Sequence, residues 1–218
     1  MRTLLILSLV LFGCSDDKTN NTTPDARPPA DAAVDTMTVD LTCTNYCTTI
    51  ATSCTGNLAQ FGGSTAADAT AHCMGTCTTF MNSATQAGDT LGCHLYHAQV
   101  AGMAGNAATH CPHAGPGGDV LGSTTATCGD PCTNFCTLVQ GTCSGANAAY
   151  ASMGECMTAC GGFSTATAYT VNTTAFPSTN PSGNNLACRL YHATNAAVSA
   201  AAATTHCPHT KMVSAVCM

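Results

Sequence analysis

The fold is decided by two stretches that match each other, CTNYCTTIATSC at residues 43–54 and CTNFCTLVQGTC at residues 132–143. In each stretch the cysteines are four and then seven residues apart. A helix turns once every 3.6 residues, so this spacing places all three cysteines on one helix face. A second CxxxC pair follows in each copy, at Cys73 and Cys77 and at Cys156 and Cys160. The sequence therefore predicts pairs of helices that face each other through cysteines.

The match continues along the chain as CMGTC with CMTAC, CHLYH with CRLYH, and HCPH with HCPH. Of the 17 cysteines, one lies in the apolar leader and each copy holds eight. An even set in an exported chain is typical of a disulfide framework. We therefore expect a signal peptide at 1–13, a lipid anchor and disordered linker at 14–42, one cysteine-rich repeat at 43–128 and another at 129–218.

Disulfides must stabilise each repeat, because a repeat is small and poor in large apolar side chains. Antiparallel packing of the two CxxxC helices joins their cysteines in two bridges, each worth about 2–4 kcal/mol. Four cysteines then remain in each copy, and they allow three pairings. With our choice among these, the expected bridges are Cys43–Cys77, Cys47–Cys73, Cys54–Cys111, Cys93–Cys128, Cys132–Cys160, Cys136–Cys156, Cys143–Cys207 and Cys188–Cys217. The CxxxC part of each repeat resembles the stapled helical hairpins of twin-CxxxC proteins.

The fold class we expect is mainly α and disulfide-rich, with two tandem stapled helical bundles and long irregular loops. A third helix should begin near Cys93 or Cys188 and end at Pro112 or Pro208, since the alanine-rich stretch at 193–205 favours helix. The matching aromatic residues of the repeats are expected in the core. The insertion at 161–187 is expected to be a surface loop with a short strand at 168–172.

The leader predicts where the protein resides. Met1 and Arg2 precede an apolar run that is too short to span a bilayer, which needs roughly 20 residues, and that suits a secretory signal. Residues 11–14, LFGC, resemble the lipobox of bacterial lipoproteins, which implies a lipid on Cys14 that holds the protein in the membrane. The resemblance implies export and lipid anchoring in the bacterial cell envelope, at the outer membrane or cell surface. An ordinary secretory cleavage that leaves a spare thiol is the alternative.

The histidines are the candidate ligand residues. Three match between the copies, namely His97, His110 and His113 with His192, His206 and His209. Imidazole is a frequent ligand of Zn and Cu, and HCPH places two rings three residues apart. An unbroken helix would separate His97 from His110 by about 20 Å, so a three-histidine site needs a helix break or the other copy. We favour a structural interpretation, in which the histidines cap helix ends and bond to carbonyl groups beside a disulfide.

Other chemistry has little support in the sequence. The CxxCH signature of haem attachment is absent, which makes haem a weaker alternative than Cu or Zn. No GxSxG, HExxH or phosphate-loop motif occurs, so we do not expect an enzyme. The net charge is −6, most of it in the linker, and no basic patch exists for nucleic acid.

Taken together, the lipobox and the CxLYH and HCPH motifs resemble an uncharacterised group of cysteine-rich bacterial lipoproteins. We expect a structural or binding element with no cofactor and an unknown envelope or extracellular partner.

Overall fold

The structure, a computed structural model, describes residues 40–173 and 181–218. The leader, Cys14 and nearly all of the linker lie outside these residues. The first half, residues 40–128, contains α1 (Cys43–Ser53), α2 (Ala66–Cys77), α3 (Leu91–Ala101), α4 (Ala107–Ala114) and the 3₁₀ helix η1 (Gly56–Leu58). The second half, residues 129–218, contains α5 (Pro131–Thr142), α6 (Met153–Cys160), α7 (Leu186–Ala196), α8 (Ala200–His206) and the 3₁₀ helices η2 (Gly145–Asn147) and η3 (Cys207–Thr210).

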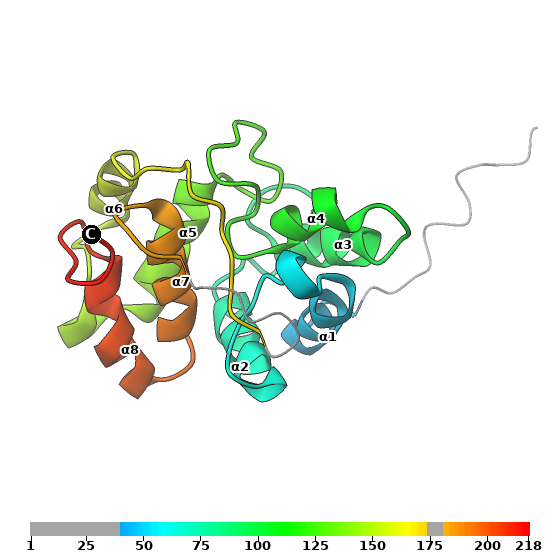
Figure 1. Cartoon of the computed structure of the whole chain (residues 1–218), viewed down its shortest axis with the longest axis horizontal. Coiled ribbons are helices and arrows are strands. Elements are labelled where there is room, and N and C mark those ends of the chain that lie inside the picture. Colours follow the sequence, from blue (N-terminus) through cyan, green and yellow to red (C-terminus); the bar gives the residue numbers. More distant parts are fainter. Residues whose placement is uncertain (1–39, 174–180) are drawn as a thin grey trace, which may run out of the picture. The chain divides into compact units, whose positions relative to one another are not determined.

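The expected fold class, mainly α and disulfide-rich, is confirmed (Figure 1). The described residues contain isolated β-bridges and no named strand. The insertion therefore has no strand at 168–172, and this part of the prediction is wrong. The segment instead lies against the first half, where the Asn172 carbonyl accepts a hydrogen bond from the Gly63 N–H at 2.7 Å. Strand ladders need a regular series of such bonds, and no strand is assigned to the described residues of this segment.

Small polar side chains determine where the helices begin. Before every described α-helix except α4, the side chain of the preceding residue accepts a hydrogen bond from a backbone N–H of the first turn, which would otherwise have no partner. The capping residues are Thr42, Thr65, Thr90, Asp130, Ser152, Asn185 and Ser199. The abundant Thr, Ser and Asn of this sequence thus define helix starts in a chain with few large apolar residues.

The structure contains the eight expected disulfide pairs, four from the CxxxC spacing and four from our choice among the remaining cysteines. Two of them join α1 to α2, and two join α5 to α6. The Cys54–Cys111 bridge connects the end of α1 to α4, and Cys143–Cys207 makes the corresponding connection in the second half. These last bridges fix the HCPH segments, because each uses the cysteine inside that motif.

Each half has its own hydrophobic core. Tyr46, Phe61 and Phe80 are buried in the first, and Phe135, Tyr150 and Phe163 are buried in the second, as expected. The expectation is wrong for Tyr96, which is 38% exposed, and for its counterpart Tyr191, which is half-buried. The reason is register, since α3 buries Leu91 and Leu95 and successive helical side chains point about 100° apart.

The third helix of each half is broken in two, contrary to expectation. Gly102–Asn106 separate α3 from α4, and Ala197–Ser199 separate α7 from α8. In the second half alanine propensity is overridden by local side-chain bonds: Thr194 and Asn195 both donate to the Tyr191 carbonyl, and Ser199 caps α8. Pro208 does follow the end of α8, whereas Pro112 lies inside α4, which continues to Ala114.

The break in the second half lies against α2. A Cβ atom on Gly75 would be 2.2 Å from the Ala197 carbonyl oxygen, so only glycine allows this approach.

Among the described residues, no helix combines the length and the apolar character that crossing a bilayer requires.

Candidate metal centres

The helix breaks bring the matching histidines together. His97 lies near the end of α3, and His110 and His113 lie three residues apart on α4, which packs on α3. In the second half His192 lies on α7, His206 ends α8 and His209 lies in η3. In each set the candidate ligand atoms lie within 4.8 Å of one another. We call His97, His110 and His113 the first cluster, and His192, His206 and His209 the second cluster.

The ring nitrogens of each cluster converge. In the first cluster Nδ1 of His97 lies 2.8 Å from Nδ1 of His110. In the second, Nδ1 of His192 lies 3.0 Å from Nδ1 of His206 and 3.3 Å from Nδ1 of His209. A neutral imidazole has one N–H and one lone pair, so hydrogen bonds among three rings cannot satisfy all of these nitrogens. Lone pairs directed at a common point are what a metal ion requires.

The distances also match a coordination sphere. Zn–N bonds of about 2.05 Å at tetrahedral angles place neighbouring nitrogens about 3.3 Å apart. The nitrogen–nitrogen distances of 3.0 and 3.3 Å in the second cluster lie close to this value, and 2.8 Å in the first is somewhat shorter. Two pairs of the second cluster and one pair of the first are therefore spaced much as two imidazoles on one ion would be, and in both clusters the third ligand atom lies within 4.8 Å of the others.

The structural interpretation holds for position, because His113, His206 and His209 lie in the last turns of their helices. Within residues 40–173 and 181–218, however, the rings contact one another, and no bond from a clustered ring to a carbonyl group is seen. That role belongs to another histidine, His94, which is fully buried. Its Nδ1 lies 3.3 Å from the Ala114 carbonyl, its Nε2 lies 3.2 Å from Asp89, and its ring stacks on Phe80 at 3.9 Å. His94 is thus structural, whereas the clusters are not explained by helix capping.

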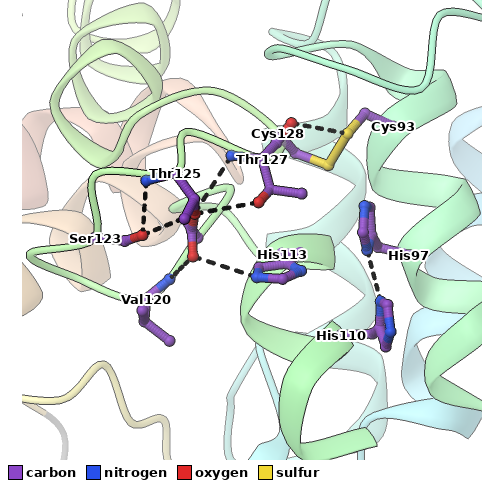
Figure 2. Close-up of polar contacts among 10 residues, drawn as sticks. Cys93, His97, His110, His113, Val120, Ser123, Thr125, Thr127 and Cys128 are labelled. Atoms are coloured by element: carbon purple, nitrogen blue, oxygen red, sulfur yellow. Dashed lines mark hydrogen bonds and ion pairs between the residues drawn. A yellow bond between two sulfur atoms is a disulfide. The ribbon is translucent and has the colours of Figure 1, made fainter. Parts of the chain in front are cut away.

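Disulfides flank both clusters. Cys93 and Cys188 each precede a cluster histidine by four residues, and their bridges lie beside His97 and His192. Figure 2 shows His97 between the Cys93–Cys128 bridge and His110. Because disulfide sulfur offers no thiolate, cysteine is not a ligand in the oxidised protein, and nitrogen is the donor. The bridges instead fix the backbone on which the histidines stand.

A tyrosine hydroxyl anchors the end of each HCPH segment. Tyr46 donates to the Ala114 carbonyl at 2.6 Å, and Tyr150 donates to the Thr210 carbonyl at 2.7 Å. Each carbonyl belongs to the residue after the last histidine of its segment. The two tyrosines come from positions that do not match between the halves, yet they hold the same carbonyl in place.

Burial and mutual repulsion keep the central histidines neutral. His97 and His192 are 7% and 8% exposed. Burial, followed by the neighbouring histidines, lowers the pKa of His97 to about 4 and the pKa of His192 to about 3. Burial also lowers the pKa of His206 and of His113. Neutral imidazole is the form that binds metal, so these rings are ready to bind at neutral pH.

Sequence reasoning missed Asp119, whose Oδ1 lies 3.3 Å from Nε2 of His113. Burial alone would raise the pKa of this carboxyl, but hydrogen bonds from Thr125, Val120, Thr127 and Ser123 outweigh it and lower the pKa. Asp119 is one of few charged residues in the repeats and closely follows HCPH, which is the only signal the sequence offers.

No known protein family matches the chain, and neither a characterised protein nor a solved structure matches it.

Proposed function

We propose that the protein binds one Cu or Zn ion at each histidine cluster. The observation that carries this proposal is the convergence of Nδ1 atoms from separate helical elements in both halves. Histidine nitrogen suits Zn and Cu better than it suits Mg or Ca, which prefer oxygen. Haem gains no support from this geometry, because the rings contact one another and leave no room for a porphyrin between them.

The proposed sites suit reversible binding. Three histidines leave a fourth position of a tetrahedral ion open to water or another ligand, unlike structural zinc sites with four protein ligands. Disulfides tie α3, α4, α7 and η3 to other parts of the fold, so we expect the fold not to depend on metal as a zinc finger does. In each cluster one histidine is buried and the other two are half-buried, which leaves a route from solvent. We therefore favour metal capture, storage or delivery over catalysis.

The cellular setting is part of the same proposal. The lipobox at 11–14 supports lipidation of Cys14 and attachment to the bacterial cell envelope. A linker of acidic and small residues would then hold the metal-binding part away from the membrane. The partner that supplies or receives the metal would be an envelope or extracellular component.

Metal titration of the purified full chain in detergent tests the proposal. Isothermal titration and elemental analysis should give two Zn ions per chain in the wild type. His97→Ala and His192→Ala should each bind one ion, and the double variant should bind none. His72→Ala is the control, because the half-buried His72 ring contributes to the lowered pKa of His206 but is not one of the converging ligands, and this variant should still bind two. A wild type that binds no ion, or a double variant that still binds two, would refute the proposal.

A further inference from the structure

The two clusters consist of three matching histidines each but differ in the groups that contact the outer side of those rings. In the first cluster the Asp119 side chain is 1% exposed and lies 3.3 Å from Nε2 of His113. Its carboxylate is itself held in place by the loop that follows HCPH. The groups that donate to it are the Val120 N–H at 2.7 Å, the Ser123 hydroxyl at 3.0 Å, the Thr127 N–H and hydroxyl at 3.3 Å each, and the Thr125 hydroxyl (Figure 2).

This carboxylate determines which nitrogen of His113 faces the cluster. An ionised carboxylate only accepts hydrogen bonds, so Nε2 of His113 must carry the proton and Nδ1 must carry the lone pair. Nδ1 of His113 is fully buried and has no hydrogen-bond partner among the described residues. A buried nitrogen without a partner is costly unless a ligand completes it. Asp119 thus presents His113 in the form that binds metal.

The second cluster lacks this arrangement. Its half contains two acidic residues, and both serve at helix starts: Asp130 caps α5, and Glu155 accepts from the Ala151 N–H beside α6. The segment that carries Asp119 has no counterpart, since only seven residues separate His209 from Cys217. No ion pair to His192, His206 or His209 occurs in the described part of the chain.

We propose that Asp119 is a positioning residue that makes the first cluster the tighter of two unequal metal sites. This inference rests on the proposed function and adds the order in which the two clusters bind metal. A carboxylate on the outer nitrogen of a ligating histidine fixes the ring, increases its basicity and adds negative charge, and losing one typically costs 10–100-fold in metal affinity. The first cluster should therefore fill before the second, with Zn²⁺ held about 10–100-fold more tightly.

Two single-site chains measure this difference. His192→Ala retains only the first cluster and His97→Ala retains only the second. Competition with a chromophoric chelator should give the first cluster a Zn²⁺ dissociation constant about 10–100-fold lower. Asp119→Asn in the His192→Ala chain removes the charge but retains an oxygen acceptor, and it should weaken binding toward that of the second cluster. Glu155→Gln in the same chain is the control and should change nothing.

A second readout separates positioning from folding. Ring ¹⁵N chemical shifts of the metal-free chain should show His113 protonated on Nε2, and Asp119→Asn should reduce that preference. Because both single-site chains retain Asp119, their comparison does not depend on whether Asp119→Asn folds. Equal affinities of these two chains, or no effect of Asp119→Asn, would overturn the inference and leave metal binding intact. Absence of Zn²⁺ binding in both chains would instead refute the proposed function.

Discussion

Replacement of Arg189 tests how the second half is held together. This side chain is fully buried, and its guanidinium lies 3.8 Å from the centroid of the Phe163 ring. In the first half, His94 occupies the matching position and stacks on Phe80 in the same way. Arg189 donates to four carbonyl groups and one amide oxygen, those of Lys211, Asn185, Met212, Cys217 and Asn184. No carboxylate pairs with it among the described residues. Arg189 therefore holds the C-terminal segment by hydrogen bonds to neutral groups.

The expected cost of Arg189→Met follows from the carbonyl groups it would leave behind. Those of Lys211 and Met212 belong to exposed residues and can bond to water instead. The bonds to the carbonyls of Asn185 and Cys217 are buried, and each carbonyl left without a partner costs about 1–3 kcal/mol. The midpoint for the pair is about 4 kcal/mol, which lowers Tm by roughly 8–16 °C in a domain of this size.

Chemical and thermal denaturation of the oxidised full chain measures this loss. Lys211→Met is the control, because it removes an exposed cation whose backbone carbonyl is retained, and its effect should stay within about 0.5 kcal/mol. Hydrogen exchange should also show faster exchange near Cys217 in Arg189→Met, although the Cys188–Cys217 bridge keeps the segment attached. An Arg189→Met chain within 1 kcal/mol of wild type would show that the buried carbonyls find other partners and that our reasoning is wrong.

Two further predictions concern the clusters. Because the pKa values of His97 and His192 fall from 6.5 to about 4 and about 3, the unfolded chain takes up protons first on acidification. The metal-free protein should therefore keep its stability above pH 6.5 and lose it progressively between pH 6.5 and about 3. A constant Tm across this range would show that the two histidines are not held neutral by the fold. Gly118 has φ +68° and would place a Cβ 2.1 Å from the Cys128 carbonyl oxygen. Gly118→Ala should displace the Asp119 loop and weaken Zn²⁺ binding at the first cluster alone, measured in the single-site chains, and equal weakening at both clusters would count against it.

The helical hairpins could be predicted because the four-residue cysteine spacing is itself a helical period. The clusters could not, because they depend on where a helix stops. The stretch at 193–205 consists mostly of alanine, and its propensity indicates one continuous helix. The break depends on the bonds of Thr194 and Asn195 to one carbonyl and on the Ser199 cap, which together outweigh a preference of a few tenths of a kcal/mol per residue. The role of Asp119 could not be predicted, because its contact with His113 depends on the path of a loop. A loop has no repeating sequence pattern from which its path could be inferred.

Comparison of matching positions in the two halves helps to distinguish residues kept for packing from residues kept for ligand binding. Some buried positions differ between the halves: Arg189 replaces His94, and the tyrosine that anchors each HCPH segment comes from a different position. The cluster histidines are the same in both halves, although two of the three in each are half-buried and add little to the core. Core packing gives little reason to keep a half-buried imidazole against two others, and the neighbouring rings disfavour protonation of His97 and His192. The metal ligand set that we propose would account for both the identity and the placement of these residues.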